Sequence, residues 1–209
     1  MPSNARSIVL SLLGAASIGP GLIGLVSLAA VLGGCNQLPP ERGTHVQTVA
    51  SDKLDKRNAI EVALPPIQNA TGDDTVPIVA LREAFQAGLV RRRYSPLSLD
   101  YVDRKVIDAT YTPGSLQESA VLQIEIEGWD TSLLETHAAL TVKARARLID
   151  AENPQNGQLW SGTLDHRFDF EAERDHYTTQ ESFLRYACGR VADELLAALP
   201  AREAPQPGG

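Results

Sequence analysis

Two carboxylates, Glu125 and Glu127, alternate with apolar residues in the segment AVLQIEIEGW. Side chains two residues apart on a strand lie about 7 Å apart on one face, a separation that suits acid–base chemistry. In the next predicted strand, Lys143, Arg145 and Arg147 alternate with apolar residues in the same way. Pairing of Glu127 with Lys143, and of Glu125 with Arg145, would form an ion-pair ladder between neighbouring strands. We expect this ladder rather than a catalytic pair.

The four histidines are the other residues whose type could support catalysis or metal binding. His166 falls on the apolar side of a predicted strand, whereas His45, His137 and His176 lie in the predicted tether, at a strand start and in a loop. No two of them have metal-ligand spacing, and no cysteine cluster accompanies them. We therefore predict no metal, no cofactor and no enzymatic activity. A hydrolase or small-ligand site using His166 and the acidic strand residues is the alternative.

A charge-free run over residues 7–34 follows a single arginine and ends in Leu32, Gly33, Gly34 and Cys35. A long apolar run behind a positive residue is typical of an export signal. A membrane-spanning helix is the other interpretation, but a Gly-Pro-Gly interruption disfavours it. The ending resembles the lipobox of bacterial lipoproteins. This resemblance implies that signal peptidase recognises Leu32, Gly33 and Gly34, and that Cys35 is lipidated and anchors the chain to a membrane.

The residue after the cysteine and the charge balance restrict the compartment and the partners. In bacterial lipoproteins, an aspartate after the lipidated cysteine retains the chain at the inner membrane. The resemblance therefore implies that Asn36 directs this chain to the outer membrane, facing the periplasm. Residues 1–34 hold one basic side chain and no acidic one, so the chain without them keeps 18 basic and 26 acidic side chains, a net charge of −8. Such a chain has no overall attraction to nucleic acid. If Cys35 carries lipid, Cys188 has no partner for a disulfide within the domain.

Proline, glycine and mixed charge mark both ends of the mature chain as poor in regular structure. We predict a signal peptide over 1–34, a lipidated cysteine with a flexible tether over 35–58, one domain over 59–199, and a disordered tail over 200–209.

The hydrophobic periods within the domain predict eight elements in the order β-α-β-(short α)-β-β-β-α. The strands are predicted at 59–64, 94–99, 120–129, 140–149 and 159–170, and the helices at 76–92, 100–109 and 179–199. The first three elements form a parallel βαβ unit, and the last three strands form an antiparallel meander. The predicted fold is mixed α/β, with a five-stranded mixed sheet and helices mainly on one face.

The longest early helix, predicted at 76–92, has a charge polarity. Asp73, Asp74 and Thr75 precede its apolar stripe and can cap its start, and the arginines at 91–93 end it. Acidic side chains near the start of a helix and basic ones near its end interact favourably with the helix dipole and stabilise the helix.

Two segments resemble known lipoproteins. AIEVALPPIQNATG, at 59–72, is similar to the opening of periplasmic lipoproteins related to the amino-terminal domain of TolB, a group that includes LpoB and CsgG. A later pattern resembles neisserial-type lipoproteins of unknown function, through Trp129, Leu148, Asp150, Gly157, Leu159, Trp160 and Gly162. The resemblance implies this fold and the periplasm, and it transfers no catalytic residue.

We therefore expect a membrane-anchored periplasmic lipoprotein that acts as a non-enzymatic adaptor or accessory subunit of a cell-envelope complex, in secretion, transport or wall synthesis. The expected partners are a membrane, an envelope protein and, through an exposed strand edge, a second copy of the chain.

Overall fold

In the part of the chain that the structure describes, seven strands form one mixed sheet in the order β1-β7-β6-β5-β2-β4, with β3 paired to β5 beside that path. The computed structural model describes residues 45–50, 53–155 and 157–203. The strands are β1 (His45–Ala50), β2 (Glu61–Ala63), β3 (Gln68–Asn69), β4 (Ser95–Pro96), β5 (Ala120–Asp130), β6 (Ala139–Asp150) and β7 (Gln158–Asp169). The helices are α1 (Lys53–Arg57), α2 (Ile78–Arg91), α3 (Leu99–Ile107), α4 (Leu134–His137) and α5 (Gln180–Leu196), with a 3₁₀ turn η1 (Arg174–His176). The mixed α/β class is confirmed, and the predicted count of five strands is wrong.

The meander of β5, β6 and β7 is antiparallel, as predicted. Leu122 lies opposite Leu148, and Leu148 lies opposite Trp160, so large apolar side chains share one face. The intervening residues point to the other face, because side-chain direction alternates along a strand. The alternation of apolar and polar residues therefore fixes which face of the meander is buried.

The predicted βαβ unit is also present. β2 and β4 are parallel, with α2 between them in the chain. Pro96 lies in β4, the last strand on that side of the sheet. Proline donates no hydrogen bond to a ladder, so an edge position tolerates it.

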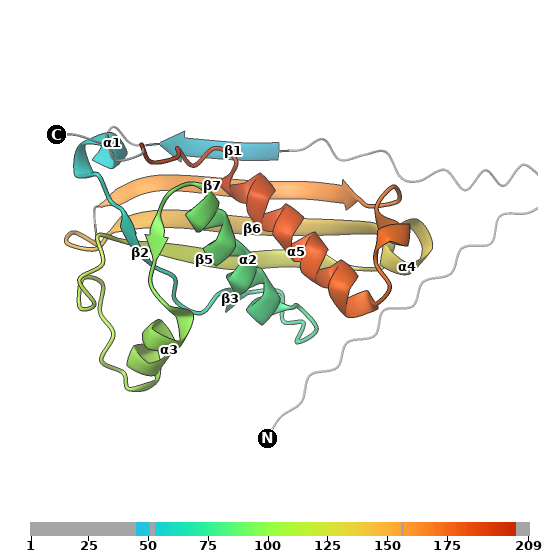
Figure 1. Ribbon diagram of the computed structural model, residues 1–209, viewed down its shortest axis with the longest axis horizontal. Coiled ribbons are helices and arrows are strands. Elements are labelled where there is room, and N and C mark those ends of the chain that lie inside the picture. Colours follow the sequence, from blue (N-terminus) through green and yellow to red (C-terminus); the bar gives the residue numbers. More distant parts are fainter. Residues whose placement is uncertain (1–44, 51–52, 156, 204–209) are drawn as a thin grey trace, which may run out of the picture. The chain divides into compact units, whose positions relative to one another are not determined.

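α2 and α5 lie side by side across one face of the sheet (Figure 1). α2 buries Leu81, Phe85 and Leu89 against the sheet, at the spacing of an inward helix stripe. α5 begins with a capping box, in which the side-chain oxygens of Thr179 and Ser182 each accept a hydrogen bond from the other residue's backbone N–H. Its inward residues include Ala187, Cys188, Val191, Leu195 and Leu196.

A smaller apolar cluster lies on the opposite face of the sheet, and it includes Val102 of α3. Ala63 and Val121 belong to this cluster, whereas their neighbours Val62 and Leu122 belong to the main core. Strand alternation therefore puts the two clusters on opposite faces. Helices cover mainly one face, as predicted, and α3 covers the start of β5 on the other.

The flexible tether predicted over 35–58 is wrong for its second half. Residues His45–Ala50 form β1, antiparallel to β7, and Lys53–Arg57 form α1. Val46 packs partly against the core and Leu54 is fully buried. β1 is held by backbone hydrogen bonds to the edge strand β7. Such bonds form with almost any side-chain pattern, so the sequence pattern does not reveal this strand.

The tail predicted over 200–209 is wrong for its first residues. Arg202 is buried, and its guanidinium donates hydrogen bonds to the carbonyl oxygens of Ala59 and Leu54, at 3.0 and 3.2 Å. It also lies over the ring of Tyr94, 5.1 Å from the ring centroid. The Arg202 guanidinium, the bond from the Arg202 backbone N–H to the Arg92 carbonyl, and the bond from the Tyr94 hydroxyl to the Pro200 carbonyl hold this segment on the domain. A hydrophobic pattern cannot indicate such contacts.

Candidate functional site

The predicted anchor, Cys35 with Leu32, Gly33 and Gly34, lies outside the described residues, as do all of 1–44. Residues 36–44 are all that separate Cys35 from β1, which begins at His45. Over 45–50, 53–155 and 157–203, none of the helices combines the length and apolar character needed to cross a bilayer.

The strand carboxylates form part of the expected ladder on the polar face of the sheet. Glu125 lies opposite Arg145, as predicted, but within the described residues the two side chains form no ion pair. A bulge between Ile126 and Gly128 places Gly128 opposite Lys143. The predicted pair of Glu127 with Lys143 is therefore wrong. Glu127 instead forms an ion pair with Arg145 at 2.7 Å.

Lys143 turns to the next strand along, where its Nζ lies 3.7 Å from a carboxylate oxygen of Asp165. Two ion pairs thus cross from strand to strand on this face, one from β6 to β5 and one from β6 to β7. Ion pairs on such a solvated face contribute about 0–1 kcal/mol each.

His166 is not brought together with these carboxylates. Its ring meets the ring of Phe168 edge-on, with centroids 4.5 Å apart, on the face of β7 that carries Leu164. Asp165 and Glu127 belong to the other face, because neighbouring strand residues point in opposite directions. Among the described residues, no group of three His, Cys, Asp or Glu could hold a metal ion.

Cys188 is fully buried in α5. Burial disfavours the thiolate and raises the pKa of the Cys188 thiol to about 12. This thiol is therefore protonated and inaccessible in the folded chain at neutral pH.

Two hollows lie on either side of the start of α2. One, of about 550 Å³, is lined by residues that include Asp74, Val79, Glu83, Glu181 and Arg185. The other, of about 390 Å³, lies between α2 and α3, and its lining includes Pro66, Val79, Arg82, Asp103 and Ile107. Neither includes His166 or Glu127 in its lining. A hollow of about 430 Å³ on the polar face of the sheet is lined by Glu127, Lys143 and Asp165 but not by His166.

Arg82 fixes the floor of the second hollow. Its buried guanidinium donates two hydrogen bonds to the carbonyl oxygen of Leu64, at 3.0 and 2.6 Å. It also pairs with both carboxylate oxygens of Asp103, at 2.6 and 2.8 Å. The sequence interpretation missed this residue, since a charge beside an apolar helix stripe usually faces solvent.

The outward side of α2 is the second feature that the sequence interpretation missed. Its exposed residues, here called the outer stripe, are Val79, Glu83, Ala87, Val90 and Arg91. Val79 is 73% exposed and Val90 is 58% exposed, and Ile107 on α3 is 81% exposed. The spacing of i, i+4, i+8 and i+11 was visible in the sequence and could have revealed a second stripe on this helix.

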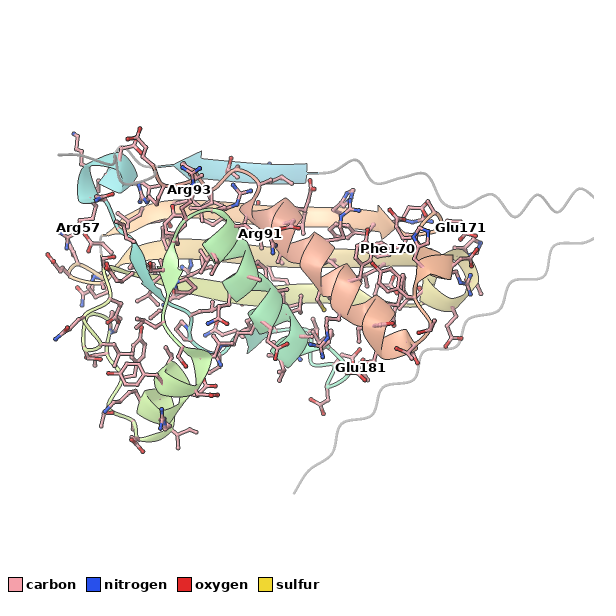
Figure 2. All side chains as sticks on the ribbon, in the orientation of Figure 1. Arg57, Arg91, Arg93, Phe170, Glu171 and Glu181 are labelled. Atoms are coloured by element: carbon pink, nitrogen blue, oxygen red, sulfur yellow. The ribbon has the colours of Figure 1, made fainter. Side chains whose placement is uncertain are left out.

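Ion pairs link α2 to α5 along their length. Figure 2 shows Arg91 and Arg93 at the end of α2, and Glu181 at the start of the neighbouring α5. Glu83 pairs with Arg185 at 3.5 Å, and Arg91 pairs with Asp193 at 2.5 Å. The two helices therefore run parallel.

No protein family and no curated protein matches this chain. Its fold is similar to that of the PelC dodecamer from Paraburkholderia phytofirmans, with a TM-score of 0.51, 16% identity, and 77% of this chain and 99% of that chain covered. Lipoprotein GNA1162 from Neisseria meningitidis gives a TM-score of 0.43 at 20% identity, over 63% of this chain and 95% of that chain. The solved structures similar to this chain thus include lipoproteins, and the likeness to PelC shows a shared fold.

Proposed function

We propose that this chain is a non-enzymatic lipoprotein, anchored through Cys35 to the outer membrane, that serves as an accessory subunit of a cell-envelope complex. The observation that carries this proposal is Cys35 itself, behind two glycines at the end of a charge-free run. A thioether-linked diacylglyceryl group with an acylated amine would give firm anchoring.

The short link to the anchor supports a role close to the membrane. Ten Cα-to-Cα steps separate Cys35 from His45, the first residue of β1. A fully extended chain covers about 3.3–3.6 Å per residue, so the link spans at most about 35 Å. In this proposal β1 would therefore begin within about 35 Å of the membrane surface.

The fold and the polar groups support binding rather than catalysis. His166 and the strand carboxylates lie on opposite faces of the sheet, so they cannot act on one substrate atom. The similar PelC structure is described as a dodecamer, which favours self-assembly of this chain as part of the proposal. We also propose, from the segment at 59–72, that it belongs to the TolB amino-terminal-domain group.

Metabolic labelling with a palmitate analogue tests the anchor in intact cells. We expect label on the unaltered chain and on Cys188→Ala, and none on Cys35→Ser. Membrane fractionation should follow the label. An unaltered chain that carries no label and keeps residues 1–34 would overturn the proposal.

A thiol count gives an independent readout of the same chemistry. Because Cys188 is buried and its thiol has a raised pKa, a maleimide should find no reactive thiol in the folded lipidated chain. One reactive thiol that disappears in Cys35→Ser would show that Cys35 is free. Denaturation should expose Cys188 in every variant that keeps it.

A further inference from the structure

The outer stripe of α2 is more apolar than a helix side facing water usually is. Val79 and Val90 stand at its two ends, both more than half exposed, and Ala87 between them is small. Eleven residues separate the two valines, or about 16 Å along a helix. A neighbouring helix could therefore lie along the stripe and contact both.

Two charged side chains at the ends of α2 are available to a partner. Within the described residues, the side chains of Asp74 and Arg93 form no hydrogen bond or ion pair. Asp74 precedes the start of α2 and Arg93 follows its end, so one end is acidic and the other basic. A second α2 lying antiparallel would bring Arg93 of each copy near the partner's Asp74.

The helix dipoles also favour the antiparallel arrangement of two α2 helices. Because α2 and α5 run parallel, their dipoles add within one copy. An antiparallel copy opposes them, whereas a parallel copy would place acidic ends together and basic ends together. Charge complementarity thus selects one orientation of one occupant.

We propose that a second copy of this chain packs on the outer stripe, with its α2 antiparallel, so that Val79 of each copy contacts the partner's Val90. Such an interface is isologous, since each contact occurs twice about a two-fold axis. The axis passes between Glu83 and Ala87, and the small side chain of Ala87 permits close approach. This inference rests on the self-assembly part of the proposed function and names its surface.

Disulfide crosslinking of the full chain in native membranes tests the orientation. Val79→Cys with Val90→Cys in one chain cannot crosslink internally, because a disulfide needs Cα atoms within about 7 Å. We expect the double variant to form an oxidised dimer, and either single variant to form at least about tenfold less. Val49→Cys, at a similarly exposed valine on β1, is the matched control.

Three outcomes would overturn the proposal. In the first, the double variant crosslinks no better than the Val49→Cys control. In the second, Val79→Cys alone crosslinks as well as the double variant, which would indicate parallel helices. In the third, the control gives the strongest dimer, which would indicate docking through the edge of β1.

Charge reversal provides a second readout on the detergent-solubilised full chain. Asp74→Arg or Arg93→Asp alone should weaken the dimer about tenfold, and the two together should restore it. Failure of the pair to restore the dimer would contradict the antiparallel contact. Palmitate labelling of the same samples separates the two proposals, since an unlabelled chain that still crosslinks refutes the anchor alone.

Discussion

The polar face of the sheet and the outer stripe of α2 both face solvent, but their charges are paired differently. On the sheet, Glu127 pairs with Arg145 and Lys143 pairs with Asp165. At the ends of the stripe, Asp74 and Arg93 have no side-chain partner within the described part of the chain. The strands β5, β6 and β7, each described over its whole length, also carry no large exposed aliphatic residue.

Exposed apolar side chains distinguish the stripe more than unpaired charges do, since Glu125 and Arg147 on the sheet face also form no side-chain hydrogen bond or ion pair within the described residues. Cross-strand pairs remove the need for external charges, and polar spacing keeps the face wet. Covering an exposed valine with another surface lowers the free energy by about 25 cal/mol per Å² of apolar area removed from water. The stripe, rather than the sheet face, is therefore the expected contact surface.

The largest expected effect separates the two sides of α2. Phe85→Ala should lower the free energy of unfolding by about 3–5 kcal/mol, because Phe85 is fully buried. Val79→Ser on the outer stripe should change it by less than about 0.5 kcal/mol. Urea denaturation at low protein concentration, where dimers do not contribute, measures both. Equal losses would mean that the stripe belongs to the fold.

The next effect concerns the floor of the hollow between α2 and α3. Arg82→Met removes the hydrogen bonds to the Leu64 carbonyl and the fork on Asp103. A buried acceptor left without a partner costs about 1–3 kcal/mol. Arg104→Met is the control and should cost less than about 0.5 kcal/mol, since Arg104 is exposed and, among the described residues, its side chain bonds only the Asp100 carbonyl of its own helix. Urea denaturation of the two variants should show this difference.

A smaller effect tests whether the sheet face satisfies itself. A double-mutant cycle with Glu127→Gln and Arg145→Gln should give a coupling energy of about 0.2–1 kcal/mol. Added salt should reduce it, because both groups are partly exposed. Neither variant should alter crosslinking through Val79→Cys and Val90→Cys. Loss of that crosslink would mean that the sheet face also contributes to the dimer.

Long, regular patterns in the sequence predicted the fold well. The alternation in β5, β6 and β7 and the stripe of α2 identify elements whose burial depends on side-chain period. β1, α1 and the Arg202 contacts could not be found in that way. β1 depends on backbone pairing to the edge strand β7, and α1 depends on the burial of Leu54. The Arg202 contacts depend on one guanidinium that reaches carbonyl oxygens far away in the chain.

The candidate site was harder to predict than the fold. The ladder was expected, but one bulge changed the partner of Glu127, and a bulge of one residue has no clear sequence signal here beyond Gly128. Exposure of Val79 and Val90 depends on which side of α2 meets α5 and the sheet. Only tertiary packing decides that.

The smallest expected effect concerns Asp73, which precedes α2. The predicted cap is wrong, since Pro77 is the N-cap and no side chain caps the helix. Asp73 instead accepts hydrogen bonds from the backbone N–H of Thr75, at 2.8 Å, and from its hydroxyl, at 2.7 Å. These bonds favour the carboxylate and lower the pKa of Asp73, first through the backbone and then through the hydroxyl.

The pKa of Asp73 is therefore lower in the folded chain than in the unfolded chain, where it is about 4. The Asp73 carboxylate stabilises the fold at pH values above the unfolded pKa. This stabilisation is lost as the pH falls through the folded pKa. An NMR titration should find that Thr75→Val raises the Asp73 pKa only in part, because the larger backbone bond remains. Thr71→Val is the control, since the Thr71 hydroxyl accepts from the Asp73 N–H and leaves the carboxylate bonds intact. A larger rise in that control than in Thr75→Val would contradict the assignment.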